Sequence, residues 1–202
     1  MKKVFLVLSV IVGLLCLTSC KQTSTNTGTK PVPQSASTSQ KPAASKIQAK
    51  KITVTSSSID QSGKLPIETA ANNDSNNPPG GNKSPQVGWN AVDGAAGYAV
   101  CMYDDDAGWM HWFVSDIKTT SLNRGAYTDK KHYVGPYPPR GSGKHHYRIE
   151  IFALKQLPTE SLADVDASVN YDKLVNKLNQ VNGNDDNILA RGYVIGTYEN
   201  KS

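Results

Sequence analysis

The chain has 202 residues, of which 38% are hydrophobic and 19% are charged. Its formal net charge is +5, and Lys2 and Lys3 contribute two of these positive charges. So small an excess does not predict a nucleic-acid partner, because nucleic-acid-binding domains carry dense basic patches. The length and the hydrophobic fraction fit one globular domain with its own core.

Residues 1–19 have the features of a secretory signal peptide. Two lysines precede the apolar run 4–15, which is too short to span a bilayer. The segment ends in Leu17-Thr18-Ser19-Cys20, which resembles the lipobox of bacterial lipoproteins, where the cysteine is lipidated and becomes the new N-terminus. We therefore predict a lipid anchor at Cys20 that holds the protein on the extracytoplasmic face of the cell membrane. The alternative is an ordinary secretory peptide followed by a free cysteine.

The remainder of the chain divides into a polar segment and a domain. Residues 20–50 are mostly Ser, Thr, Pro, Gln, Ala and Lys, so they cannot bury enough apolar surface to fold. We predict a lipidated, disordered tether over residues 20–50 and one folded domain over residues 51–202. Because Cys16 is lost with the signal peptide and Cys20 is lipidated, Cys101 has no disulfide partner within the chain. A hydrophobic core, in which we expect Cys101 to be buried and inert, must therefore stabilise the domain.

The pattern of the domain is mainly that of β-strands. Short runs rich in β-branched and aromatic residues are bounded by Gly, Pro, Asn or Asp. The predicted strands cover residues 52–55, 85–91, 98–103, 112–117, 147–154 and 193–198. Short strands joined by long loops predict a β-sandwich.

One segment has helical rather than strand periodicity. Its apolar residues on one stripe are Tyr171, Leu174, Val175, Leu178 and Val181. Gly183 is placed to end this helix. We expect the helix to cover part of the core rather than to carry function.

Residues 135–143, GPYPPRGSG, form the most distinctive predicted loop. Three prolines and three glycines in nine residues make a segment that is both rigid and open. Such a loop usually brings its backbone close to a ligand or to another segment. The segments 72–83 and 124–132 are also predicted to be loops.

Side-chain alternation along three predicted strands places an ionisable residue at the end of an apolar face in each strand. The three series are Tyr98, Val100, Met102 and Asp104; His111, Phe113, Ser115 and Ile117; and His145, Tyr147, Ile149, Ile151 and Ala153. The opposite face of the last strand carries His146, Arg148 and Glu150, and we expect these three side chains to be solvated.

If these strand ends adjoin, Asp104, His111 and His145 surround a small cavity with an apolar floor. A carboxylate beside an imidazole fixes which ring nitrogen keeps its hydrogen, so that the other nitrogen can donate to an anion. The Tyr147 hydroxyl and amides of the loop 135–143 would add donors for a phosphate, carboxylate or sulfate group. The alternative for each residue is a structural hydrogen bond at a strand end.

Three blocks of the sequence resemble, in order, the signatures of the phosphatidylethanolamine-binding proteins, also called Raf-kinase-inhibitor-like proteins. They are SPQVGW (84–89), YDDDAGWMHW (103–112) and GPYPPRGSGKHHY (135–147). The third block is the most specific, and the resemblance spans nearly all of residues 52–198. It implies a mainly β fold, namely a β-sandwich with a few peripheral helices and a small anion-accepting pocket at one end.

The resemblance also implies a set of ligand-binding residues. Carried over by motif, they are Asp104, His111, Gly135, Tyr137, Pro139, His145 and Tyr147. The chain departs from the family's Asp-Pro-Asp-Ala-Pro box, because Asp105 and Gly108 replace both prolines. Tyr137 stands where relatives usually have a small residue or cysteine, which predicts a narrowed or partly plugged pocket mouth.

Two functions from different classes follow from the sequence. The leading hypothesis is a surface-anchored protein that binds a phosphate-bearing small molecule or a phospholipid headgroup. The second is a protein-interaction or inhibitor module acting on an extracellular hydrolase or another envelope protein, because the family includes regulators of kinases and peptidases.

The sequence does not predict an enzyme. The segment around Ser142 lacks the glycine spacing of a nucleophile elbow. It is not a P-loop either, because Pro138 replaces the opening glycine and His145 replaces the required Ser or Thr. We predict no cofactor and no metal, because the spacing of Asp104, His111 and His145 matches no known ligand motif.

Overall fold

The computed structural model describes residues 49–183 and 185–201 of the chain. The predicted signal peptide, the lipidation site at Cys20 and nearly all of the predicted tether lie outside the described residues. The predicted domain boundary at residue 51 falls within the first described strand.

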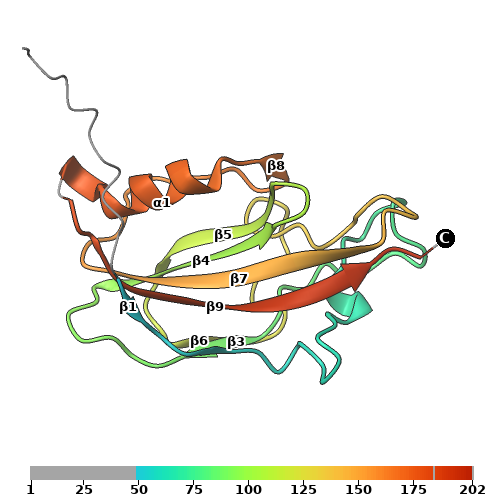
Figure 1. Ribbon diagram of the computed structural model, residues 1–202, viewed down its shortest axis with the longest axis horizontal. Coiled ribbons are helices and arrows are strands. Elements are labelled where there is room, and N and C mark those ends of the chain that lie inside the picture. Colours follow the sequence, from blue (N-terminus) through green and yellow to red (C-terminus); the bar gives the residue numbers. More distant parts are fainter. Residues whose placement is uncertain (1–48, 184, 202) are drawn as a thin grey trace, which may run out of the picture. The chain divides into compact units, whose positions relative to one another are not determined.

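The larger of two sheets contains six strands in the order β1-β9-β7-β4-β5-β8 (Figure 1). These strands are β1 (Lys50–Lys51), β4 (Gly97–Asp104), β5 (Trp109–Ile117), β7 (Lys144–Leu154), β8 (Ala167–Ser168) and β9 (Ile188–Glu199). All neighbours pair antiparallel except β1 and β9, which run parallel. The long central strands arise from the β-branched and aromatic runs identified in the sequence.

A second sheet of three short strands lies below the first in Figure 1. Its strands, in the order β2-β3-β6, are β2 (Val54–Thr55), β3 (Val87–Trp89) and β6 (Ser121–Leu122). One apolar cluster combines residues of both sheets, including Val87, Val100 and Ile151, which are fully buried. The mainly β sandwich predicted from the sequence is therefore confirmed.

The predicted helix forms as α1 (Tyr171–Asn179) and covers the other face of the large sheet. The side chain of Asn170 caps it by accepting a hydrogen bond from the Lys173 N–H. Leu174 and Leu178 of its apolar stripe are buried in a second cluster with residues of β4, β5 and β7. Two 3-10 turns, η1 (Ile67–Thr69) and η2 (Val181–Gly183), complete the helical elements of the described residues.

The face of β7 that was expected to be solvated is partly covered, and the prediction for Glu150 is wrong. Glu150 is only 2% exposed. The Tyr171 hydroxyl of α1 donates to it at 2.5 Å, and Arg148 and Arg191 lie 3.6 Å and 3.8 Å from its carboxylate. Burial raises the pKa of this carboxyl group despite these partners. The strand pattern could not show that α1 folds back over this position.

The predicted alignment of His111 with Phe113 is also wrong. Met102 pairs with Trp112 across β4 and β5, whereas Tyr103 pairs with Met110. His111 is therefore the extra residue of a β-bulge, which reverses the alternation at this point. Phe113 packs in the cluster under α1 instead.

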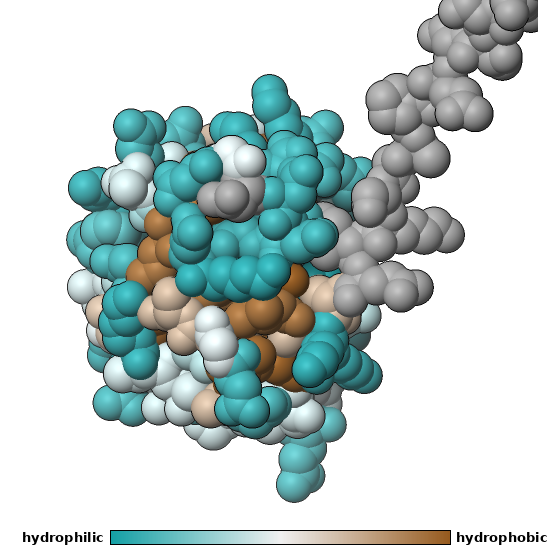
Figure 2. Space-filling view, turned by 90° about the vertical axis from the view of Figure 1, so that its left-hand side faces the viewer, coloured by the Kyte–Doolittle hydropathy of each residue, from teal (hydrophilic) through white to brown (hydrophobic). Residues whose placement is uncertain are grey.

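The two ends of the large sheet are distinct. Lys50, at the start of the described domain, pairs with Ala190 near the beginning of β9, whereas His145 pairs with Tyr198 near the end of β9. Eight residues of extended strand separate these positions by about 27 Å. Figure 2 looks onto the end that holds β1 and shows apolar side chains gathered among hydrophilic ones. Within the described residues, no helix has the length and apolar character needed to cross a membrane.

Candidate functional site

A cavity of about 190 Å³ lies at the end of β4, β5 and β7 remote from β1. Its lining residues are Asp104, Ala107, Trp109, His111, Tyr137, Pro138, Pro139 and His145. Five of the seven predicted ligand-binding residues are among them. The cavity is smaller than the roughly 300–1,000 Å³ of pockets that enclose drug-sized ligands, so its volume suits a small group.

Asp104 ends β4 and forms the centre of the polar wall. It is 2% exposed, and its Oδ1 atom accepts hydrogen bonds from the N–H groups of Asp106 and Ala107 at 2.9 Å and 3.0 Å. The tight turn that follows β4 turns these amides back towards the carboxylate. These hydrogen bonds hold the Asp104 carboxylate in a fixed orientation in the cavity wall.

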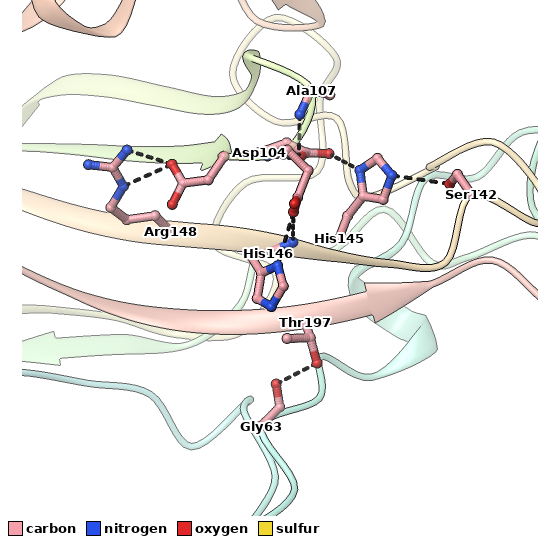
Figure 3. Close-up of polar contacts among 10 residues, drawn as sticks. Gly63, Asp104, Ala107, Ser142, His145, His146, Arg148 and Thr197 are labelled. Carbon is pink, nitrogen blue, oxygen red and sulfur yellow. Dashed lines mark hydrogen bonds and ion pairs between the residues drawn. The ribbon is translucent and has the colours of Figure 1, made fainter.

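His145 is oriented by Asp104. Its Nδ1 atom lies 2.8 Å from Oδ2 of Asp104, and its Nε2 atom lies 3.1 Å from Oγ of Ser142 (Figure 3). The Asp104–His145–Ser142 row has the distances of a catalytic triad, so the direction of each hydrogen bond decides its chemistry.

Ser142 has a second acceptor besides the imidazole of His145. Its Oγ atom also lies 2.7 Å from the carbonyl oxygen of Pro139, which can only accept. A hydroxyl has one hydrogen, so Ser142 can donate to Pro139 or to His145 but not to both. When it donates to Pro139, Oγ accepts from Nε2 of His145. That direction is opposite to the one required of a serine nucleophile activated by a histidine.

His111 lines the cavity from the bulge in β5 and is 3% exposed. Its Nδ1 atom lies 2.8 Å from the carbonyl oxygen of Val134 and must donate to it. Burial lowers the pKa of this imidazole although Val134 and Asp104 act in the opposite direction. Neutral His111 therefore carries its hydrogen on Nδ1 and offers an unprotonated Nε2 to a ligand.

An aromatic wall completes the cavity. Trp109 and Tyr137 both line it, and both donate a side-chain hydrogen bond to Oδ1 of Asp166. Burial, followed by the nearby Asp166, raises the pKa of Tyr137 to about 12, so its hydroxyl is protonated at neutral pH. The tyrosine predicted to narrow the mouth thus lies in the cavity wall, with its ring centre 5.8 Å from that of His111.

Gly135 and Tyr147 do not line the cavity, although the sequence predicted both in the site. The Gly135 N–H donates to Oδ1 of Asn82 at 2.9 Å, so it is not available to a ligand. A Cβ atom at this position would lie 1.9 Å from the carbonyl oxygen of Thr69. The glycine is thus required for close backbone packing rather than for contact with a ligand.

Tyr147 lies behind the cavity, fully buried, with its ring centre 5.2 Å from that of His111. Its hydroxyl has no hydrogen-bond partner among the described residues. Burial and the nearby Asp104 raise its pKa, so the group stays neutral. The Tyr147 ring thus packs edge to face against the His111 ring.

Sequence reasoning missed four residues of the site. Ala107 and Trp109 lie within the second of the three sequence blocks, and Pro138 lies in the Pro-rich loop, so their positions carried a signal. No sequence signal identified Asp166, because it is 29 residues from Tyr137 and belongs to a polar segment without a recognisable motif. Only the folded chain brings it to the cavity.

Asp104, Asp106 and His145 could together offer ligand atoms to a metal ion, since these atoms lie within 4.8 Å of one another. Each of these three side chains already makes other hydrogen bonds in this structure. Asp104 and His145 bond to each other, and Oδ2 of Asp106 accepts from the backbone N–H and Nδ1 of His146 at 2.6 Å and 3.0 Å. A metal would have to displace these bonds, so the cluster gives no positive argument for one.

Comparison with known proteins was consistent with this fold. The protein UPF0098 YbcL of Escherichia coli is 33% identical over 108 residues, covering 41% of this chain and 59% of the relative. The proposed lipoprotein LppC of Mycobacterium tuberculosis is 33% identical over 100 residues, covering 39% of this chain and 48% of the relative. A UPF0098 protein of Aquifex aeolicus is 30% identical over 136 residues, covering 57% and 74%. The chain thus spans about half of LppC and under two thirds of YbcL.

Two solved structures are similar. The crystal structure of E. coli YbcL, described as a new member of the mammalian PEBP family, matches with a TM-score of 0.56 and 26% identity, covering 74% of this chain and 98% of that one. CT736 of Chlamydia trachomatis, a proposed phosphatidylethanolamine-binding protein homologue, matches in fold with a TM-score of 0.54 and 20% identity, covering 75% and 99%.

The sequence model of the phosphatidylethanolamine-binding protein family matches residues 55–199. This range contains all three sequence blocks, both sheets apart from β1 and the first residue of β2, and every residue that lines the cavity. The chain therefore belongs to the phosphatidylethanolamine-binding protein family.

Proposed function

We propose that this protein binds a phosphate-bearing small molecule or a phospholipid headgroup in the cavity. The proposal rests on one observation, namely that the two imidazoles of His111 and His145 line the same small cavity with Asp104 fixed behind His145. The low volume and the hydrogen-bonding groups of the two imidazoles favour a compact anion over a large apolar ligand.

The hydrogen-bond pattern indicates which form of phosphate fits. In the proposed complex, His145 donates through Nε2 to a ligand oxygen that takes the place of the exposed Ser142, whose Oγ retains its contact with the Pro139 carbonyl oxygen. Neutral His111 accepts through Nε2. One donor and one acceptor match the monoanion of a phosphate or phosphomonoester, which carries both a P–O⁻ and a P–OH group.

We further propose that the protein acts as a lipid-anchored module at the envelope surface and not as an enzyme. The lipobox-like segment ending at Cys20 supports the anchor, and the relative LppC is itself named a proposed lipoprotein. The cavity lies about 27 Å of strand away from the end where the described domain begins. The Pro139 carbonyl oxygen competes with His145 for the Ser142 hydroxyl hydrogen, which supports a role other than hydrolysis by a serine nucleophile.

A titration followed by NMR tests the proposal directly. The ring signals of the four histidines are recorded while inorganic phosphate or phosphoethanolamine is added. We expect the signals of His111 and His145 to shift in a saturable manner, and those of the exposed His132 to remain in place. A His145→Asn variant should lose the response, whereas a His132→Asn variant should retain it. The absence of any saturable shift at His111 and His145 would contradict the proposed function.

A further inference from the structure

The two aromatic side chains of the cavity wall donate hydrogen bonds to the same carboxylate. Nε1 of Trp109 donates to Oδ1 of Asp166 at 3.2 Å, and the hydroxyl of Tyr137 donates to the same oxygen. We call these three residues the mouth clasp. Trp109 begins β5, Tyr137 belongs to the loop 135–143, and Asp166 precedes β8, so the clasp joins three separate segments.

Backbone hydrogen bonds hold two residues of the mouth clasp, Trp109 and Asp166, in place. Trp109 pairs with Ser168 across β5 and β8, and the N–H of Asp166 donates to the carbonyl oxygen of Met110 at 2.8 Å. Asp166 has a positive φ of 62°, a conformation that Asp tolerates better than most residues. The Asp166 carboxylate is therefore held at the start of β5 without help from a ligand.

The opposite side of the clasp is also restrained. Tyr137 stands between Pro136 and Pro138, whose rings restrict the backbone on both sides. Its ring lies edge to face with His111, and its hydroxyl is the remaining point of attachment. Without the bond to Asp166, the side chain of Tyr137 could rotate away from the cavity towards solvent, because the residue is only half-buried.

The geometry points to a role for the mouth clasp in specificity: Asp166 holds Tyr137 in the cavity wall, so the cavity admits phosphate or a short phosphomonoester and excludes esters with bulky substituents. This inference rests on the proposed function and adds a limit on ligand size. Asp166 is a positioning residue, because it does not line the cavity itself. Tyr137 and Trp109 set the size of the space that it maintains.

Paired titrations with two probes test the inference. Dissociation constants for inorganic phosphate and for phenyl phosphate are measured by the histidine NMR shifts, and the ratio of the two constants reports discrimination against bulk. The variants are Tyr137→Ala, Asp166→Ala and Asp166→Asn, and the matched control is Asp164→Ala, an exposed aspartate two positions before Asp166. Removing the charge of Asp166 changes the affinity for both probes, but the ratio cancels that common effect.

The amide of Asp166→Asn still accepts from Trp109 and Tyr137, so this variant keeps the clasp and loses only the charge. We expect Tyr137→Ala and Asp166→Ala to reduce discrimination against phenyl phosphate by about ten-fold or more. Asp166→Asn and Asp164→Ala should discriminate as the unmodified protein does. Retention of the native thermal transition by each variant shows that it is folded. A further variant, Tyr137→Phe, lacks only the hydroxyl and therefore removes the hydrogen bond to Asp166 while keeping the ring.

The outcomes separate the two claims. If inorganic phosphate shifts neither cavity histidine in any protein, the proposed function fails and the size limit fails with it. If phosphate binds but Tyr137→Ala, Tyr137→Phe and Asp166→Ala all discriminate as the unmodified protein does, the inference alone is overturned. Equal loss of discrimination in Asp166→Ala and Asp166→Asn would show that keeping the acceptor oxygen does not maintain the size limit, and would also overturn the clasp.

Discussion

The Nδ1 atom of His145 lies 2.8 Å from Oδ2 of Asp104, and the other oxygen of that carboxylate is held by two backbone amides. Because the amides restrain Asp104 independently of His145, the carboxylate determines the orientation of the imidazole. The Asp104–His145 pair therefore links the turn after β4 to the start of β7, and the first prediction concerns this link.

Replacing Asp104 with Asn should weaken both stability and anion binding. The amide oxygen of the variant can still accept from the backbone, but its NH₂ group then faces Nδ1 of His145, which must accept instead of donate. We expect a loss of about 1–3 kcal/mol in the free energy of unfolding, measured by urea titration, together with weaker phosphate binding. Asp93→Asn, at an exposed position, is the control. Unchanged phosphate affinity in Asp104→Asn would show that the Asp104 carboxylate does not contribute to anion binding.

The stability of the domain should depend on pH through His111. Burial lowers the pKa of His111 in the folded chain, whereas the unfolded chain titrates at about 6.5. Below that value the unfolded state binds more protons than the native state, so the free energy of unfolding falls as the pH decreases from about 6.5 towards the folded pKa. In His111→Asn, whose amide can still donate to Val134, this part of the dependence should disappear. An identical slope in both proteins would contradict the assignment.

Gly135→Ala should be strongly destabilising because the added Cβ would lie 1.9 Å from the carbonyl oxygen of Thr69. We expect a loss of about 3 kcal/mol or more, since two backbone segments must separate. Gly63→Ala separates this effect from backbone strain, because Gly63 has a φ of 80° but nothing within 4 Å of a Cβ atom. That variant should lose only about 1–2 kcal/mol. Comparable losses for the two variants in chemical denaturation would refute the packing argument.

Tyr171→Phe should loosen the contact between α1 and the large sheet. The lost hydroxyl donates to Glu150, which is buried and depends on it together with Arg148 and Arg191. We expect a loss of about 1–3 kcal/mol in unfolding free energy and faster amide hydrogen exchange in α1. Tyr193→Phe is a suitable control, because Tyr193 is 56% exposed. Equal stability of both variants would indicate that Glu150 does not need this partner.

Cys101 should be unreactive in the folded protein. The residue is fully buried in β4, and burial raises the pKa of its thiol, so very little thiolate is present at neutral pH. In a Cys20→Ser chain produced without the signal peptide, Ellman's reagent should react with one thiol after denaturation and with almost none before it. Rapid labelling of the native chain would show that β4 opens readily.

Much of the domain could be predicted from local pattern. The strands around Val100 and Ile151 and the helix that contains Leu174 and Leu178 formed where the spacing of apolar residues placed them. Side-chain alternation holds along β4 because its ladder with β7 is uninterrupted from Gly97 to Asp104. In such stretches, the two-residue period of the strand is enough to assign faces.

The failures occur where a second segment intervenes. The bulge at His111 depends on the register of β5 against β4, and the burial of Glu150 depends on α1 returning over β7. The partnership of Tyr137 with Asp166 likewise joins positions 29 residues apart. None of these relationships has a local signature in the sequence, because each is decided by which distant backbone lies alongside.

The sequence by itself thus determined the central strands β4, β5, β7 and β9, the helix, most of their apolar faces and the candidate residues Asp104, His111 and His145, because periodicity and residue type are local properties. Only the tertiary structure decided that His111 faces the cavity from a bulge, that Gly135 and Tyr147 pack behind it, and that Asp166 accepts hydrogen bonds from two side chains of the cavity wall. The physical reason is that burial, register and hydrogen-bond direction depend on neighbours that the folded chain brings from elsewhere in the sequence.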